Sequence, residues 1–208
     1  MPDPSQGVCA VVLCAGQGSR YRSHQNQDKL LASCYAHTDS PPILAATLAA
    51  LSGVAERTVV MVRDDNRQLL KWLDAQAAKL NVEVCAVQST GLGHSLAQAV
   101  ERFPARRGWL VALGDMPYVK SATLARIAAQ INESNLVVPT YAGRRGHPRG
   151  IGTAHWAALL ELSGDSGAQV LFNSADDIVE LALDDPGVLL DVDTPQDRLH
   201  RPGDTTSG

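Results

Sequence analysis

The chain has 208 residues, of which 45% are hydrophobic and 19% charged, a composition that fits a globular protein and excludes a disordered one. It carries 18 Lys and Arg residues against 22 Asp and Glu, and the net charge of −4 argues against nucleic acid as a partner. No apolar run approaches the roughly 18 residues of a membrane span. Residues 1–7 also lack the basic and apolar parts of a secretory signal. We therefore expect a cytoplasmic protein that does not contact membranes.

The length suits a single domain with a sizeable core. No linker interrupts the sequence, so we predict one domain over residues 1–208, with its core at about 8–199 and a flexible tail at 201–208. The four cysteines form no CxxC pair, and we expect free thiols in a reducing compartment, with Cys9 and Cys85 in the core.

Five continuous apolar runs are typical of strands that are buried on both faces of a parallel sheet. These runs are Val8–Leu13, Thr58–Val62, Val82–Val87, Trp109–Leu113 and Leu136–Pro139. Amphipathic stretches that predict helices fall between the strands. They are Pro42–Leu51, Asn66–Leu80, Ser95–Phe103 and Ser121–Glu133, the last with Ser121 placed as its cap. The alternation predicts an α/β fold, with a mostly parallel sheet covered by helices on both faces.

The rhythm changes after Pro139. Thr140–Gly152 is rich in Gly and Arg, which indicates a loop or a strand pair around a site. Helices are predicted next, followed by two short strands. The helices are Thr153–Leu162 and Gly167–Asn173, and the strands are Ile178–Leu183 and Val188–Leu190.

Ligands of open parallel sheets bind beyond the carboxyl ends of the strands, and the loop after the first strand is rich in small residues. Gly16 and Gly18 allow a close backbone approach, and such a loop suits anionic oxygens. Arg20 and Lys29 follow with positive charge. The alternative is a plain turn that uses glycine for its geometry. Tyr21 breaks the glycine fingerprint of dinucleotide-binding proteins, which disfavours an NAD(P) oxidoreductase.

Carboxylates follow two other predicted strands. Asp115 comes after Leu113-Gly114, and Asp191 and Asp193 come after Leu190. Carboxylates at strand ends are candidate ligands of a hard cation such as Mg²⁺. The alternative for Asp115 is that it caps a turn. The alternative for the last segment is that Asp193 or Thr194 caps a helix starting at Pro195, and such a cap is compatible with metal binding by this segment.

Cations after one strand and carboxylates after two others suggest a polyphosphate held with a divalent metal. Phosphoryl and nucleotidyl transfer need this arrangement, because the phosphorus centre is shielded by negative oxygens that must be neutralised and aligned.

Six segments, in order along nearly the whole chain, resemble the motifs of MobA-like nucleotidyltransferases. Gly146-His147-Pro148 and Gly164-Asp165-Ser166-Gly167-Ala168 resemble in particular the molybdenum cofactor cytidylyltransferase branch. The other four are Leu13-Cys14-Ala15-Gly16-Gln17-Gly18-Ser19-Arg20 with Lys29, Thr90-Gly91-Leu92-Gly93-His94-Ser95-Leu96, Gly114-Asp115-Met116-Pro117, and Asp191-Val192-Asp193-Thr194-Pro195-Gln196-Asp197.

The resemblance implies a three-layer α/β/α, Rossmann-like domain of the nucleotide-diphospho-sugar transferase type. It also implies an enzyme that joins an NTP to a small phosphorylated acceptor and releases pyrophosphate. In the cytidylyltransferase branch the nucleotide is CTP and the acceptor is molybdopterin, with a molybdoenzyme or its chaperone as a further partner.

The resemblance also implies roles for single residues. Arg20, Lys29 and Asp115 would be catalytic, and Asp115 and Asp193 would bind Mg²⁺. His147 would face the acceptor. Apart from the resemblance, Arg149 and the nearby arginines suit an acceptor with a phosphate, because arginine pairs bidentately with phosphate oxygens. The nucleotide would contact Leu13, Ala15, Gly16, Gly18, Arg20, Lys29, Gly93 and Ser95.

Two departures from the family pattern leave alternatives open. The stretch between Arg20 and Lys29 is longer than usual and polar, and Cys14 stands where Ala or Gly is usual, at the position linked to the choice of base. A GTP-dependent enzyme or one acting on another small phosphate or sugar phosphate is therefore an alternative, as is a non-catalytic accessory protein that binds the molybdenum cofactor.

Simpler interpretations compete for several of these residues. His147 could simply pack against Pro148, and the nearby arginines could form a solvated loop. Ser95 could be a helix cap. The three tryptophans are expected in the core.

Overall fold

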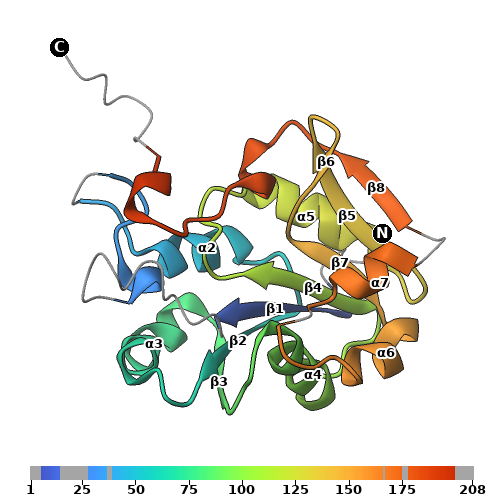
Figure 1. Cartoon of the computed structure of the whole chain (residues 1–208), viewed down its shortest axis with the longest axis horizontal. Coiled ribbons are helices and arrows are strands. Elements are labelled where there is room, and N and C mark those ends of the chain that lie inside the picture. Colours follow the sequence, from blue (N-terminus) through green and yellow to red (C-terminus); the bar gives the residue numbers. More distant parts are fainter. Residues whose placement is uncertain (1–5, 15–27, 37–38, 166, 175–177, 200–208) are drawn as a thin grey trace.

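A computed structural model describes residues 6–14, 28–36, 39–165, 167–174 and 178–199, and a single mixed sheet runs through its middle (Figure 1). The sheet has eight strands. They are β1 (Val8–Cys14), β2 (Arg57–Arg63), β3 (Glu83–Val87), β4 (Gly108–Leu113), β5 (Leu136–Tyr141), β6 (Arg144–Arg145), β7 (Arg149–Gly152) and β8 (Ile178–Ala182).

Parallel pairing dominates one half of the sheet and mixed pairing the other. The strand order is β3-β2-β1-β4-β7-β5-β6, with β8 paired to β5. Strands β3, β2, β1 and β4 run parallel to one another. Strand β7 is antiparallel to both β4 and β5, whereas β8 is parallel to β5. The predicted mostly parallel sheet is confirmed, and the Gly- and Arg-rich stretch forms a strand pair, one of its two predicted forms.

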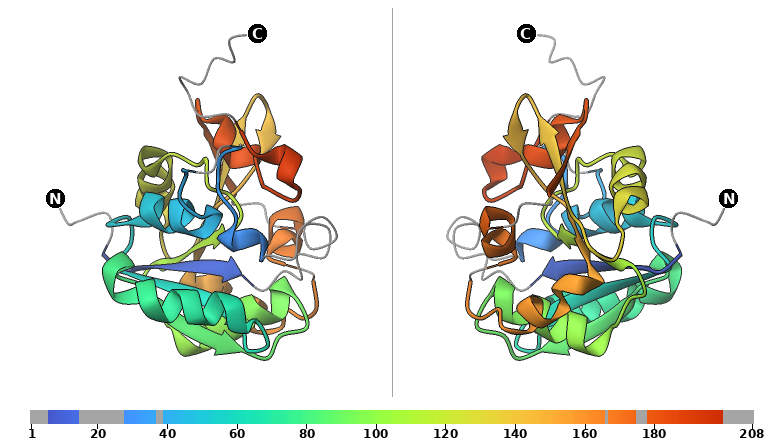
Figure 2. Two further views of the ribbon diagram at one scale, coloured as in Figure 1. Left: turned by 90° about the vertical axis from the view of Figure 1, so that its left-hand side faces the viewer. Right: turned by 90° about the vertical axis from the view of Figure 1, so that its right-hand side faces the viewer.

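Helices cover both faces of the sheet, as the side views of Figure 2 show. They are α2 (Ile43–Leu51), α3 (Arg67–Leu80), α4 (Leu92–Arg102), α5 (Ser121–Gln130), α6 (Trp156–Leu160) and α7 (Gln169–Ser174). Short 3-10 helices add η1 (Lys29–Leu31), η2 (Thr153–His155), η3 (Pro186–Leu189) and η4 (Pro195–Asp197).

Strand β1 divides the core into two clusters because its side chains alternate between the faces. Val8, Ala10 and Val12 pack with residues of α2, α3 and α5. Cys9 and Val11 pack with residues of α4, α6 and α7 on the opposite face. All seven residues of β1 are buried, as its continuous apolar run predicts.

The predicted strand Val188–Leu190 is wrong, because this segment forms the end of the 3-10 helix η3 and its C-cap. Asp185 caps that helix by accepting a hydrogen bond from the backbone N–H of Gly187, and Pro186 fixes the first helical φ. The prediction that Ser121 caps α5 is also wrong. Lys120 is the cap residue and Ser121 is the first residue inside the helix.

Two further predictions need correction. Helix α4 begins at Leu92, three residues before the predicted Ser95, so Ser95 is not its cap. Trp156 is 45% exposed and not part of the core, whereas Trp109 is buried and donates its indole N–H to the carbonyl of Phe103. Cys9 is a buried free thiol as predicted, whereas Cys85 is only partly buried and packs against the edge of the core. Within the described ranges, no helix is long and apolar enough to span a membrane.

Candidate active site

The ammonium group of Lys29 lies between two carboxylates that come from distant parts of the chain. Its Nζ is 2.7 Å from Oδ2 of Asp115 and 3.1 Å from Oδ1 of Asp193. The side chain of Lys29 is 12% exposed, that of Asp115 21% and that of Asp193 39%. The Lys29 cluster, as we call these three residues, is therefore partly shielded from water and opens toward solvent on the side of Asp193.

A tight turn after β4 positions Asp115. The backbone N–H of Gly114 donates to the carbonyl of Leu13 at the end of β1, and the hydroxyl of Thr47 donates to the carbonyl of Gly114. A Cβ atom at Gly114 would come within 2.7 Å of the Cys14 sulfur. Glycine is required here because the turn passes directly over the end of β1.

A backbone hydrogen bond ties the segment of Asp193 to Asp115. The N–H of Val192 donates to the carbonyl of Asp115 over 3.0 Å. Asp197 then accepts hydrogen bonds from the N–H groups of Asp193 and Thr194 and from the Thr194 hydroxyl. Thr194 caps η4 at Pro195, as predicted, and this capping box fixes the backbone on which Asp193 stands.

Asp28 anchors the turn that carries Lys29. Its carboxylate accepts hydrogen bonds from the N–H of Leu30 and from the side-chain amide of Asn66. Asn66 in turn caps α3 by accepting from the N–H of Leu69. The ammonium is thus connected to the rigid start of a 14-residue helix.

Negative charge outweighs positive charge around Lys29. Burial lowers the pKa of Lys29, but the charges and hydrogen bonds of Asp115 and Asp193 outweigh it, so the pKa is raised and the side chain stays charged. Partial burial raises the pKa of Asp191, and the charges of Asp115 and Asp193 raise it further. Burial, with the charge of Asp115, raises the pKa of Cys14, whose thiol stays protonated.

The donor set fits a divalent cation that arrives together with phosphate oxygens. Oδ1 of Asp115 is buried and has no hydrogen-bond partner in the part of the chain that the structure describes. In that part no group of three or more His, Cys, Asp or Glu residues could hold a metal by itself. Mg²⁺ is commonly held by one or two carboxylates and completed by waters and substrate phosphates. Asp115 and Asp193 supply such a pair.

Two predicted nucleotide contacts, Gly93 and Ser95, lie in the first turn of α4. Ser95 is fully buried, and its hydroxyl lies 2.6 Å from the hydroxyl of Ser89 and 3.1 Å from the carbonyl of Gly91. The N–H of Gly93 donates to the carbonyl of Gly164. These bonds hold the loop before α4 against residue 164 and do not join it to the Lys29 cluster.

The remaining predicted nucleotide contacts start at Leu13. Leu13 is buried at the end of β1, where it pairs with Leu113 and Met61. Ala15, Gly16, Gly18 and Arg20 lie outside the described residues.

The predicted acceptor residues, His147 and Arg149, lie on the other side of β4. Arg149 is 5% exposed, and its guanidinium carbon lies 4.5 Å from the ring centre of Phe172. Its Nε and Nη1 atoms, and Nδ1 of His147, are buried without a hydrogen-bond partner among the described residues. Burial, with the charge of Arg149, lowers the pKa of His147 to about 4. A solvated loop is therefore a wrong description of Arg149, although Arg144 and Arg145 are exposed.

Sequence reasoning missed several residues that shape these sites. Thr47, Asn66 and Phe172 carry no local signal for their contacts, which join segments far apart in the chain. Only the position of Asn66 just before an amphipathic stretch is a signal, and it predicts the helix cap rather than the bond to Asp28.

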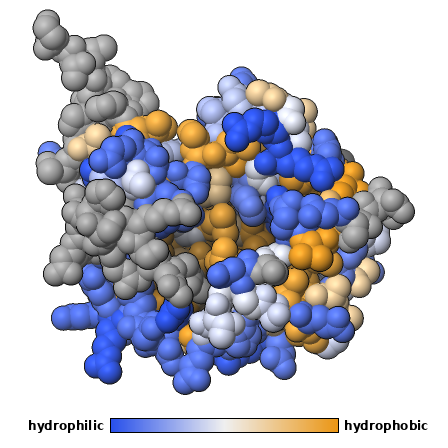
Figure 3. Space-filling model, in the orientation of Figure 1, coloured by the Kyte–Doolittle hydropathy of each residue, from blue (hydrophilic) through white to orange (hydrophobic). Residues whose placement is uncertain are grey.

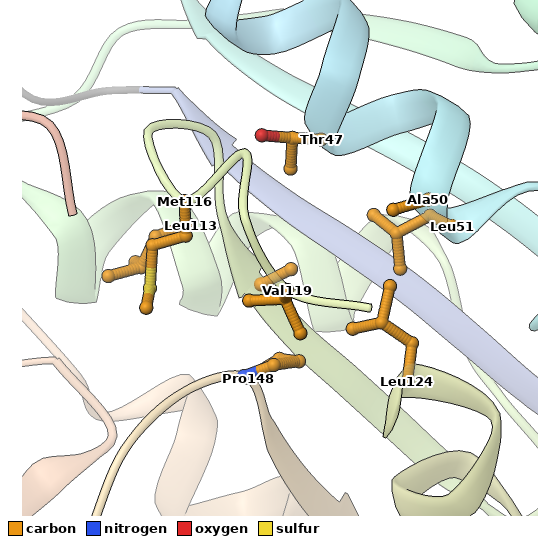
Figure 4. Close-up of a pocket in the computed structure, with 9 residues that line it drawn as sticks. Thr47, Ala50, Leu51, Leu113, Met116, Val119, Leu124 and Pro148 are labelled. Atoms are coloured by element: carbon orange, nitrogen blue, oxygen red, sulfur yellow. The ribbon is translucent and has the colours of Figure 1, made fainter. Parts of the chain in front are cut away.

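An apolar pocket lies beneath the turn of Asp115 (Figure 4). Side chains from α2, α5 and the end of β4 line it, with Pro148 closing one side. Its volume of about 10 Å³ holds one water molecule at most, so it is a packing feature and not a substrate site. In the space-filling view, hydrophobic surface also lines a hollow in the middle of the visible face, bordered by hydrophilic residues (Figure 3).

Comparison with curated proteins finds partial relatives. The bifunctional protein GlmU of Dinoroseobacter shibae is 31% identical over 134 residues, which is 64% of this chain and 28% of that protein. GlmU of Ruthia magnifica is 26% identical over 132 residues. The matches thus cover about a quarter of the length of these curated relatives.

Solved structures match over nearly the whole chain. Rv0371c from Mycobacterium tuberculosis H37Rv superposes with a TM-score of 0.74 at 30% identity, over 93% of this chain and 95% of that one. Its complex with manganese gives a TM-score of 0.70 at 29% identity, over 93% and 96%. A nucleotidyl transfer enzyme of Methanothermobacter thermautotroptrophicus shares the fold, with a TM-score of 0.73 at 21% identity over 91% and 93%.

The family model of the MobA-like NTP transferase domain matches residues 10–179. This range includes the predicted first loop, Asp115, His147 and Arg149, and only Asp193 of the predicted site lies beyond it. The sequence, the sheet topology and the solved relatives agree, and the chain belongs to the MobA-like NTP transferase family.

Proposed function

We propose that this protein transfers a nucleoside monophosphate from an NTP, expected to be CTP, to a phosphorylated acceptor of the molybdopterin type and releases pyrophosphate. The contact of Lys29 with Asp115 and Asp193 carries the proposal. Three segments that are distant in the chain bring one partly buried cation and two carboxylates together here. An arrangement of that kind is suited to a triphosphate with its divalent cation.

The residues of the cluster have separate tasks in this reaction. Asp115 and Asp193 would hold Mg²⁺, which supplies Lewis-acid stabilisation of phosphate charge when it is bound. The ammonium of Lys29, already positioned by Asp28, donates hydrogen bonds to phosphate oxygens and stabilises the charge that develops on the leaving pyrophosphate. The acceptor phosphate is an anion near neutral pH, so its attack on the α-phosphorus needs no general base.

Several observations support the finer parts of the proposal. The solved complex of Rv0371c with manganese, which is 29% identical to this chain, supports the binding of a divalent cation here. Asp115 has a buried oxygen without a partner among the described residues, which is the donor such a cation needs. The preference for CTP and a molybdopterin acceptor, and a molybdoenzyme or its chaperone as a partner, depend on the motif at Gly146-His147-Pro148.

The test is an incubation of the protein with each of the four NTPs, Mg²⁺ and molybdopterin, followed by mass analysis of the product and detection of pyrophosphate. We expect a CMP adduct of the acceptor with CTP, and none after chelation of the metal. Nucleotide binding without release of pyrophosphate would instead identify an accessory protein. A product with GTP alone would overturn the assignment of CTP but not that of nucleotidyl transfer.

A further inference from the structure

Arg149 is a buried cation that has no counterion among the described residues. The residue is 5% exposed, and its Nε and Nη1 atoms lack partners among the described residues. Burial and the charge of Arg145 both lower its pKa. Burying an ionised group without a partner is strongly unfavourable, and a protein retains such a group where a ligand supplies the opposite charge.

The sheet register turns Arg149 toward the core cluster under α4, α6 and α7. Arg149 pairs with Val111 of β4, and both Val111 and Phe172 belong to that cluster. Pro148 faces the pocket on the opposite side. A Cβ atom at Gly150 would also meet residues of that side, Ile131 and Val137. His147 comes just before β7 and lies close enough to Arg149 for the charge of Arg149 to lower its pKa.

Glu180, an acidic residue near this stretch, is already paired. Glu180 on β8 forms an ion pair with Arg145, with 2.6 Å between its Oε1 and the Nη2 of Arg145. Arg145 also donates to the carbonyl of Phe172. Phe172 itself offers Arg149 only the face of its ring, which compensates part of the burial but accepts no in-plane N–H bond. The Nε and Nη1 donors of Arg149 therefore remain without a hydrogen-bond partner among the described residues.

The position of Arg149 is separate from the Lys29 cluster but mechanically connected to it. Val111 precedes Asp115 by four residues, and the chain turns after Leu113, so the two positions are at most roughly 13 Å apart at about 3.3 Å per residue. His147 donates its backbone N–H to the carbonyl of Val188, and the same segment continues to Val192, which donates to Asp115.

We propose that Arg149 and His147 form a second oxyanion receptor, which binds an anionic group at the end of the acceptor that does not react. The inference rests on the proposed function for the identity of the ligand, since it assigns the receptor to the acceptor. Arg149 offers a planar pair of donors that matches a phosphate or a carboxylate. The unpartnered Nδ1 of His147 adds one more hydrogen bond, as a donor in the tautomer that carries the proton there.

The first test needs no transfer reaction. Thermal unfolding of the protein is followed while inorganic phosphate, or acetate as a carboxylate, replaces chloride at constant ionic strength. We expect phosphate to raise the unfolding temperature by several degrees in the wild type and in Lys29→Met, which lacks the cation of the other site. Arg149→Met should lose this rise and unfold at a higher temperature than the wild type without phosphate.

Two further variants keep this test decisive. Arg144→Gln changes an exposed arginine of the same stretch and should retain the full rise. Arg149→Lys keeps the charge without the planar donors and should retain only part of the rise in unfolding temperature. This variant takes the place of Arg149→Met if the Met variant fails to fold. A full rise in Arg149→Met or Arg149→Lys, or no rise in the wild type with either anion, would overturn the receptor. A rise with acetate alone assigns it to carboxylates.

The second test separates the acceptor from the nucleotide. Arg149→Met should raise KM for the acceptor at least tenfold and leave KM for the NTP unchanged. The opposite pattern would assign the receptor to the nucleotide and overturn its place at the acceptor. If the wild type transfers no nucleotide to any acceptor, the proposed function fails, whereas the phosphate titration still decides whether the receptor exists.

Discussion

Two cations of this protein, the partly buried Lys29 and the buried Arg149, differ in how their charge is balanced. Lys29 lies between Asp115 and Asp193, and its pKa is raised because their charges outweigh its burial. Arg149 lies against the ring of Phe172, and its pKa is lowered because burial and the charge of Arg145 act in the same direction.

The difference separates a site that is organised in advance from a site that a ligand completes. The carboxylates around Lys29 hold its side chain in position before any phosphate arrives, which reduces the reorganisation needed at the reacting phosphorus. Arg149 has rigid surroundings but unused donors, so ligand binding there relieves an electrostatic penalty that the fold carries. The same type of charge can therefore serve catalysis in one place and recognition in the other.

Removing Asp115 should have the largest effect. In Asp115→Ala we expect turnover to fall about 10³-fold, because the site loses one of the two carboxylates that would hold the metal. Steady-state release of pyrophosphate measures this. Asp74→Ala, on the exposed side of α3, is the matched control and should retain full activity. Wild-type turnover in Asp115→Ala would show that the Lys29 cluster is not the catalytic site.

Acid should weaken the region of Arg149 through His147. The pKa of His147 is about 4 in the folded chain and ordinarily 6.5, so the unfolded state binds more protons between these values. The stability is therefore complete above pH 6.5 and falls as the pH decreases toward 4, by about 3 kcal/mol at most. Urea unfolding across this pH range measures the loss, and His147→Gln should reduce it.

The matched control for that series is His155→Gln, in the η2 turn, which should keep the wild-type dependence on pH. An unchanged slope in His147→Gln would mean that His147 is not the group that takes up the proton.

Replacing Lys29 tests how charge is balanced in the Lys29 cluster. In Lys29→Met the two carboxylates lose their common partner, and we expect the free energy of unfolding to fall by about 1–3 kcal/mol, since the group is only partly buried. Millimolar Mg²⁺ should restore more stability to this variant than to the wild type, because Asp115 and Asp193 no longer share the charge of Lys29 and a cation can replace it. Lys71→Met on α3 controls for loss of a positive charge. An equal gain in stability from Mg²⁺ in Lys29→Met and in the wild type would show that the two aspartates do not bind the metal.

The smallest expected effect concerns the C-terminal segment that holds Asp193. The Tyr118 hydroxyl donates to the carbonyl of Cys34 and accepts from the N–H of Leu199. Tyr118→Phe should therefore lower the stability by about 1 kcal/mol and speed hydrogen exchange at Leu199. Tyr35→Phe, which keeps its ring contact with Tyr118, should change neither. Unaltered exchange in Tyr118→Phe would show that this hydroxyl does not fasten the segment.

The strands of the sheet could be predicted from the sequence because burial on both faces leaves a continuous apolar run, as in β1. The same reasoning failed at Val188–Leu190, because Val188 and Leu189 form the end of the 3-10 helix η3 and Leu190 is its C-cap residue. Asp185, Pro186 and Gly187 directly before them are the signals of a turn and outweigh so short an apolar run.

The sequence also singled out Lys29, Asp115 and Asp193, since they follow strand ends and match family motifs. Their mutual contact depends on one hydrogen bond between Val192 and Asp115, which no local pattern reveals. Likewise, three arginines between residues 144 and 149 look alike in sequence. Only the pairing of β7 with β4 determines that Arg149 turns inward.

The backbone bond from Val192 to Asp115 has a consequence for the order of events during synthesis. Every strand of the described sheet ends by Ala182, before Asp193 in the chain, so the segments of the scaffold are made before this carboxylate. A chain that ended between these two residues would contain all the described strands but would lack one of the two carboxylates that contact Lys29.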